Sequence, residues 1–158
     1  MAKDLKTNAI RKLEVASIEH NIKSLDIKEA VDGITCAKML EVNLDSTFKT
    51  LVTTGKSGKH YVFVVPVAEK LSLKKAANCV KEKNIEMLPV KDLLSLTGYI
   101  HGGCSPIGMK KEFQTVIDKS ALLFAKIIFS AGKIGHFIEM NPKDLNKIIP
   151  VEFHDILQ

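Results

Sequence analysis

The feature that most constrains the fold is a pair of runs rich in β-branched and aromatic residues, TFKTLVTTG at 47–55 and HYVFVVPV at 60–67. Residues of these types favour extended strands. Only a short segment from Gly55 to Gly58 separates the two runs, and a glycine-containing connection of this length favours an antiparallel hairpin. The sequence therefore predicts a β-hairpin over residues 47–67.

Helical spacing and capping residues predict helices on both sides of this hairpin. The expected helices begin at Thr7 or Asn8, at Thr35, at Ser72, at Lys91 and at Asn141-Pro142. In the helix from Ser72, the residues expected to face inward are Leu73, Ala76, Ala77 and Val80. Gly98 is expected to end the helical turn that begins at Lys91.

Short runs of alternating or apolar residues predict further strands. These runs lie at 18–28, 85–88, 113–118, 120–124, 125–133 and 135–140, and a turn is expected at Asp32-Gly33. Strands interleaved with short helices indicate a mixed α/β fold of the α+β class.

The length of 158 residues fits one domain that spans 1–158. No apolar run approaches the roughly 20 residues that a bilayer crossing needs. The N-terminal segment MAKDLKTNAIRKLE lacks the apolar core of a secretory signal. We therefore expect a cytoplasmic protein without a membrane partner. The odd set of Cys36, Cys79 and Cys104 indicates reduced thiols rather than a disulfide framework.

The formal net charge is +5, and lysine supplies every basic residue except Arg11. Lysine makes point contacts with phosphate, whereas base readout in DNA usually uses arginine. A nucleic-acid backbone is a plausible partner on this basis, and DNA read by sequence is not. A solvated surface explains the same charge equally well.

The stretch TGYIHGGCSPIGMKK, residues 97–111, differs in composition from the rest of the chain because it holds four of the nine glycines. Glycine permits positive φ, and proline stiffens the chain that follows, so residues 102–106 suit a loop whose N–H groups bind an oxygen atom. Lys110 and Lys111 could hold a phosphate nearby. The alternative is an ordinary long turn between two core elements.

Lys49 interrupts the first strand of the hairpin between Phe48 and Thr50. A lysine in this position either reaches water at a sheet edge or turns into a cleft, where its ammonium group binds an anion. The sequence leaves both alternatives open.

Other sequence patterns argue against several common sites. The histidines show no zinc-ligand spacing, and no GxSxG elbow is present, so we expect no metal, no cofactor and no serine nucleophile. The segment around Gly55-Lys56-Ser57 lacks the first glycine of a P-loop, and a strand follows it where that motif needs a helix. Cys104 with His101 could form a nucleophile and base, but no neighbouring Asp or Asn would orient the imidazole.

Several motifs taken in order resemble the YbaK/EbsC family. They are the FKTL segment, the strand VFVVPVA, the LKK helix start, the GGCSPIG loop with its two lysines, and SAGK at 130–133. The family comprises free-standing relatives of the editing domain of bacterial prolyl-tRNA synthetases, and it hydrolyses wrongly charged aminoacyl-tRNA. The resemblance implies a mixed sheet curled partly into a barrel with helices outside.

The resemblance also implies which residues form the site. It assigns catalysis to Lys49 and to the loop residues Gly102, Gly103, Cys104 and Ser105, and substrate binding to Thr50, Pro106, Ser130, Leu25 and Phe137. The implied partner is the 3′ end of an aminoacyl-tRNA, with prolyl-tRNA synthetase as a further candidate partner. The form of the glycine loop is similar to the branch that acts on Cys-tRNA(Pro), and also on Cys-tRNA(Cys), more than to the Ala-tRNA(Pro) deacylases.

Two positions depart from the family pattern. Leu25 stands where many members have a tyrosine, and Phe137 stands where many have an aspartate. Both are expected near the pocket and would make it more apolar. The chemistry needs no nucleophile from the protein, since backbone N–H groups can stabilise the oxyanion and the thiol of a cysteinyl substrate can attack its own ester. The rival hypothesis is a non-catalytic nucleotide- or tRNA-binding module.

Overall fold

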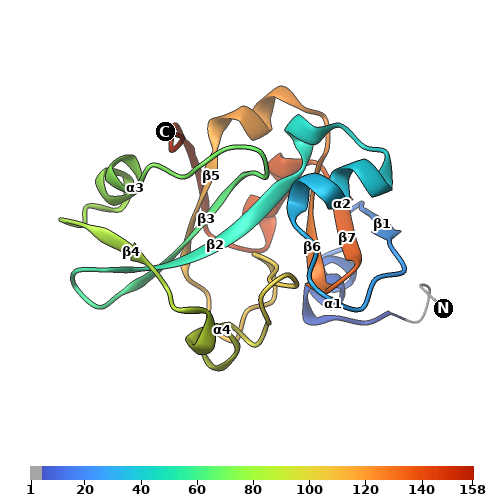
Figure 1. Ribbon diagram of the computed structural model, residues 1–158, viewed down its shortest axis with the longest axis horizontal. Coiled ribbons are helices and arrows are strands. Elements are labelled where there is room, and N and C mark those ends of the chain that lie inside the picture. The colour runs from blue at the N-terminus through green and yellow to red at the C-terminus, as the bar shows by residue number, and fades with distance from the viewer. Residues whose placement is uncertain (1–4) are drawn as a thin grey trace.

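The computed structural model describes residues 5–158 and forms two β-sheets with short helices around them (Figure 1). The helices are α1 (Asn8–Val15), α2 (Gly33–Leu40), α3 (Leu73–Val80) and α4 (Val90–Thr97), with 3-10 helices η2 (Leu44–Ser46), η3 (Lys119–Leu123) and η4 (Pro142–Lys147). The strands are β1 (Asn21–Ser24), β2 (Phe48–Gly55), β3 (His60–Pro66), β4 (Ile85–Met87), β5 (Gln114–Asp118), β6 (Ile127–Lys133), β7 (His136–Met140) and β8 (Val151–His154).

The predicted hairpin is confirmed: β2 and β3 pair antiparallel from Phe48↔Pro66 to Thr54↔His60. They belong to a five-stranded sheet in the order β4-β2-β3-β5-β8, in which β5 and β8 run parallel to β3. The other sheet has the order β1-β7-β6 and is antiparallel. The mixed α+β class is therefore confirmed.

The expected curling into a partial barrel is not confirmed, because the strands of residues 5–158 divide into two separate sheets. The sheets meet at a bridge between Thr47, just before β2, and Ile128 of β6. This junction places the start of β2 beside the three-stranded sheet and α2 (Figure 1).

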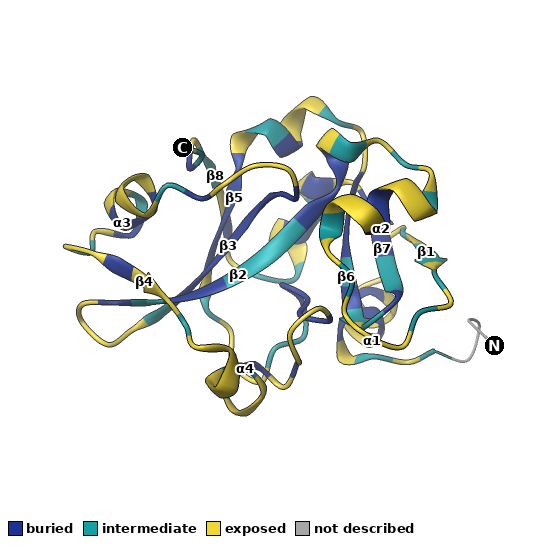
Figure 2. Cartoon of the chain, in the orientation of Figure 1, coloured by how far each residue is buried: buried dark blue, intermediate teal, exposed yellow. Residues whose placement is uncertain are grey.

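Strand β3 is buried on both faces, and its alternation divides the core into two parts (Figure 2). Val62 and Val64 pack in a cluster with α1 and β6, whereas Phe63 and Val65 pack in a second cluster that includes α3. The larger sheet therefore lies between α3 on one face and α1 with the smaller sheet on the other.

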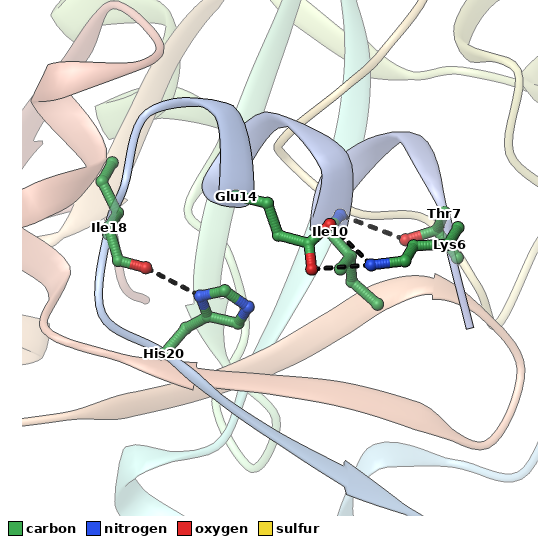
Figure 3. Close-up of polar contacts among 6 residues, drawn as sticks. All are labelled: Lys6, Thr7, Ile10, Glu14, Ile18 and His20. Carbon is green, nitrogen blue, oxygen red and sulfur yellow. Dashed lines mark hydrogen bonds and ion pairs between the residues drawn. The ribbon is translucent and has the colours of Figure 1, made fainter. Parts of the chain in front are cut away.

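Helix α1 begins where the sequence predicts it (Figure 3). The Thr7 side chain accepts a hydrogen bond from the N–H of Ile10 at 3.2 Å, and Lys6 pairs with Glu14 at 2.8 Å. After the helix, a ring nitrogen of His20 lies 2.8 Å from the carbonyl oxygen of Ile18. The hydroxyl of Thr7 also donates to the carbonyl of Ala131, which ties the start of α1 to β6.

One predicted N-cap and one predicted buried residue are wrong. Asp32, not Thr35, is the N-cap of α2, and its carboxylate accepts a hydrogen bond from the Thr35 N–H. Leu73 of α3 does not face inward, since 42% of its surface is exposed, whereas Ala76, Ala77 and Val80 are buried.

Three elements near the C-terminus differ from expectation. Residues 120–124 were expected as a strand, but they lie largely in η3, because the Asp118 carboxylate caps the Ser120 N–H and turns the chain. The helix after Asn141 is a 3-10 helix. Strand β8 was not predicted at all. None of the helices in residues 5–158 has the length and apolar composition that a membrane crossing requires.

Candidate active site

A cavity of about 350 Å³ lies where α2, the start of β2, the glycine-rich loop and the β6–β7 turn approach one another. Four segments supply its charged and polar groups and much of its wall. They are residues within 30–36 before and in α2, residues 47–51 at the start of β2, His101, Gly102 and Cys104 of the loop, and Ser130, Ile134, Gly135 and Phe137 of β6, β7 and the turn between them. The site is thus built by residues far apart in the sequence.

Lys49 projects into this cavity, so the structure favours the cleft alternative over the sheet-edge alternative. Its side chain is half-buried, and its Nζ atom donates to the carbonyl of Val67 at 3.5 Å. Burial lowers the pKa of Lys49, and the positive charge of Lys70 lowers it further. Lys49 forms no ion pair within residues 5–158, which leaves its ammonium group available to an anionic or carbonyl oxygen of a ligand.

Thr50 contributes a hydroxyl group with no partner in the described part of the chain. Its Oγ1 atom is buried and forms no hydrogen bond within residues 5–158, although the residue lines the cavity. Buried hydroxyl groups are nearly always hydrogen-bonded, so this atom is suited to bind a ligand.

The glycine-rich loop contributes Gly102 and Cys104 to the cavity wall. Gly102 has φ +87°, and a Cβ atom at this position would lie 2.6 Å from the Cβ of Ala30. The N–H of Gly103 donates within the loop to the carbonyl of Ile100 at 3.0 Å, whereas no hydrogen bond joins the N–H of Gly102 or Cys104 to residues 5–158. The N–H of His101 also has no acceptor in this part of the chain, so the loop residues that line the cavity with an available N–H are His101, Gly102 and Cys104.

Three predicted loop residues do not line the cavity. Gly103 packs against the backbone of Ile134. Ser105 is fully buried, and its hydroxyl accepts from the N–H of Ile107 at 3.3 Å. Pro106 lines a smaller cavity elsewhere. These three residues therefore pack within or behind the loop and not in the cavity wall.

Cys104 is buried, with 8% of its surface exposed. Burial raises the pKa of its thiol to about 12. Because the thiolate is the nucleophilic form, this cysteine is a poor nucleophile near neutral pH. Burial also raises the pKa of Cys36, the other thiol in the cavity wall.

Ser130 and Phe137 lie opposite each other on β6 and β7 and both line the cavity. The Ser130 hydroxyl accepts from the N–H of Gly132 at 3.2 Å, which leaves its own proton available to a ligand. Leu25 is not brought into this cavity. It lines a neighbouring hollow of about 1030 Å³ with Tyr99, Lys133 and other residues, because its N–H is held by the carbonyl of Gly135.

The two lysines that end the glycine-rich stretch also lie outside the cavity. Lys110 extends toward α4, where its Nζ donates to the Ser95 carbonyl at 3.4 Å, and Lys111 lines the smaller cavity with Pro106. Conversely, Asp32 and Cys36 line the main cavity, although no sequence pattern indicated them as site residues. The Asp32-Gly33 pair predicted only a turn.

Comparison with known proteins gives one family match. The family model for the aminoacyl-tRNA editing domain matches residues 28–148, which include all the site residues that the sequence predicts except Leu25.

Curated relatives fall into two groups. The chain is 40% identical to EbsC of Enterococcus faecalis over 96% of its own length and 93% of that protein, which bears the provisional name Cys-tRNA(Pro)/Cys-tRNA(Cys) deacylase. It is 28% identical to the proline–tRNA ligase of Pelobacter propionicus over 73% of its own length, but that match covers 20% of the ligase.

Solved structures agree with the fold. A provisionally named trans-editing enzyme for prolyl tRNA synthetase superposes with a TM-score of 0.84 at 21% identity, covering 98% of this chain and 99% of that one. The protein APE2540 superposes with a TM-score of 0.86 at 18% identity, covering 96% and 100%.

Proposed function

Because the chain belongs to the aminoacyl-tRNA editing domain family, we propose that it is a deacylase that cleaves the ester between a wrongly attached amino acid and the 3′ end of a tRNA. The observation that carries this proposal is the composition of one cavity. The ammonium group of Lys49, the unpartnered hydroxyl of Thr50 and the available N–H groups of Gly102 and Cys104 all lie in its wall.

The preferred substrate under this proposal is Cys-tRNA(Pro), with Cys-tRNA(Cys) as a second substrate. The name of the EbsC relative supports this choice, since the two chains match over nearly their full lengths. The side chain of Phe137 supports it as well, because an apolar wall disfavours an ordered water molecule and accommodates an SH group.

The proposed chemistry uses the reactivity that the ester already has. The thiol sulfur of the cysteinyl group attacks its own carbonyl carbon, and the N–H groups of Gly102 and Cys104 stabilise the negative charge that develops on the carbonyl oxygen. The C–O bond to the ribose then breaks, the thiol proton passes to the 3′ oxygen, and a cyclic thioester leaves. Lys49 holds the terminal nucleotide or the ester in position.

No thiol of the protein takes part in this scheme. Cys104 contributes its backbone N–H, and its side chain stays protonated because burial raises the pKa of the thiol to about 12. Water remains the nucleophile for substrates that lack a thiol, such as Ala-tRNA(Pro), and we expect these to react more slowly.

The same proposal implies the setting in which the protein acts. Aminoacyl-tRNA is the partner, and the cytoplasm is the expected location. Prolyl-tRNA synthetase is a further candidate partner, because two proline–tRNA ligases contain a segment that matches this chain.

Release of amino acid from purified aminoacyl-tRNA tests the function directly. The protein is mixed with Cys-tRNA(Pro), Cys-tRNA(Cys), Ala-tRNA(Pro) and Pro-tRNA(Pro), and loss of the labelled amino acid is followed over time. We expect Cys-tRNA(Pro) to be deacylated fastest and Pro-tRNA(Pro) to be spared. Binding of tRNA without release from any of them would instead support a non-catalytic tRNA-binding module.

A further inference from the structure

One exposed carboxylate borders the cavity, and no step of the proposed chemistry uses it. Among the described residues that line the cavity, Asp32 alone has an acidic side chain. Its Oδ1 accepts from the N–H of Thr35 and its Oδ2 from the Thr35 hydroxyl, both at 2.9 Å. These bonds lower the pKa of Asp32, so the group is ionised at neutral pH. They also fix its orientation while leaving lone pairs on both oxygens for a further donor.

Asp32 and Lys49 both line the cavity and do not pair with each other. Gly33, next to Asp32, lies so close to Val67 that a Cβ on Gly33 would overlap the Val67 side chain. The carbonyl of Val67 in turn accepts the hydrogen bond from Lys49. Neither charge belongs to an ion pair within residues 5–158, so both can bind groups of opposite charge on one ligand.

An aminoacyl ester carries the two groups that such a cavity would bind. The carbonyl oxygen of the ester and the nearby phosphate are electron-rich and suit Lys49. The α-amino group is largely protonated at neutral pH, since the pKa of an ordinary α-amine is about 8, and it suits Asp32. The α-carbon joins the ammonium group directly to the ester carbonyl, so a carboxylate that binds the ammonium group also fixes the carbonyl toward its oxyanion donors.

We propose that Asp32 is a substrate-positioning residue that binds the α-ammonium group of the aminoacyl ester and makes the enzyme select esters with a free amine. This inference rests on the proposed deacylase function. It assigns to Asp32 a second role beside capping α2, and it predicts that N-acylated esters, such as those of blocked or peptidyl tRNA, are poor substrates.

The test compares two substrates, Cys-tRNA(Pro) and its N-acetyl derivative, with wild-type protein and with Asp32→Asn. Asparagine caps helices as well as aspartate does, so the variant removes the charge and keeps the cap. We expect wild type to prefer the free-amine substrate about 10-fold or more in kcat/KM, the size of effect that a charge-assisted hydrogen bond supplies. In Asp32→Asn the ratio of the two rates should fall to near 1.

A matched control and a stability measurement complete the design. Asp92→Asn removes the same charge from an exposed position in α4 outside the cavity, and it should leave the ratio unchanged. An unchanged melting temperature of Asp32→Asn shows that the cap persists. A ratio that stays the same in Asp32→Asn overturns the role of Asp32, even if both rates fall, because a structural defect affects the two substrates alike. Failure of wild type to release the amino acid from any of the four aminoacyl-tRNAs named above overturns the deacylase function itself.

Discussion

The Nζ atom of Lys49 lies 3.5 Å from the main-chain oxygen of Val67, and this carbonyl is its hydrogen-bond acceptor within residues 5–158. Val67 immediately follows β3, whereas Lys49 lies near the start of β2, so the antiparallel hairpin brings the two together. The contact holds the ammonium group in the cavity wall and leaves its remaining protons for a ligand.

Replacement of Lys49 by alanine should therefore abolish most activity. Loss of a cation that acts on the reacting ester costs about 2 to 4 kcal/mol in the transition state, roughly 30- to 1,000-fold in rate. The measurement is kcat/KM for Cys-tRNA(Pro). Lys56→Ala, in the exposed hairpin turn, is the control and should retain nearly full activity. Small and equal effects at both positions would remove Lys49 from the site.

Thr50→Val should lower activity without lowering stability. Valine has nearly the shape of threonine, and the Thr50 hydroxyl forms no hydrogen bond within residues 5–158, so its removal should leave the free energy of unfolding unchanged or raise it by up to about 1 kcal/mol. Activity should fall about 5- to 10-fold, because a hydrogen bond to the substrate is lost.

The control for this substitution is Thr53→Val on the same strand. The Thr53 hydroxyl donates to the carbonyl of Tyr61 at 3.0 Å, so this variant should lose stability by about 1 kcal/mol and keep its activity. Chemical denaturation and deacylation assays distinguish the two. A Thr50→Val variant with full activity would show that the hydroxyl does not contact substrate.

Cys104→Ala should retain most activity, since the backbone N–H stays in place and the thiol is not a nucleophile at neutral pH. The assay is single-turnover deacylation of Cys-tRNA(Pro). A variant that is folded, as judged by circular dichroism, but inactive would indicate attack by the enzyme thiol instead.

Gly102→Ala should damage both activity and stability, because the added methyl group meets Ala30 and the backbone has φ +87°. Gly58→Ala is a matched control, since Gly58 has φ +91° but no atom lies within 4 Å of its added Cβ. Both substitutions place a non-glycine residue at positive φ, which costs about 1 to 2 kcal/mol of stability. Only Gly102→Ala should also lose deacylation; equal behaviour of the two variants would show that the loop position is not special.

Cysteine-charged tRNA should react far faster than the serine-charged form, which differs by one atom. The oxygen of serine is a weaker nucleophile, and the apolar side chain of Phe137 disfavours the water that would have to attack in its place. Rates on Cys-tRNA(Pro) and on the same tRNA mischarged with serine provide the comparison. Equal rates would rule out attack by the substrate thiol.

The sequence alone determined the parts of this protein that depend on local signals. The β-branched runs specified the β2–β3 hairpin, and the hydroxyl groups of Thr7 and Ser72 specified the starts of α1 and α3. Gly98, with φ +87°, ends α4 as predicted. Lys49 and the glycine-rich loop also stood out, because their composition departs from that of their neighbours.

Long-range contacts decided the rest. Strand β8 exists because it pairs parallel with β5, and its position is further fixed where the Asp118 carboxylate accepts from the N–H of Ile156 at 3.1 Å. The sequence around residues 151–156 contains neither β5 nor Asp118, so it does not predict this strand. Residues 120–124 likewise do not form the strand that their composition favours. The carboxylate of Asp118, at the end of β5, accepts a hydrogen bond from the Ser120 N–H and begins η3 there.

The membership of the site was decided in the same way. Leu25 and Asp32 are seven positions apart in one connecting segment. The hydrogen bond from the Leu25 N–H to the carbonyl of Gly135 holds Leu25 at a different hollow, whereas Asp32, as the N-cap of α2, lies in the wall of the cavity that Lys49 also lines. Sequence spacing specifies which residues are available to a site. Packing of α2 and the β6–β7 turn against the start of β2 determines which of them face the same cavity, because those contacts join segments that the sequence keeps apart.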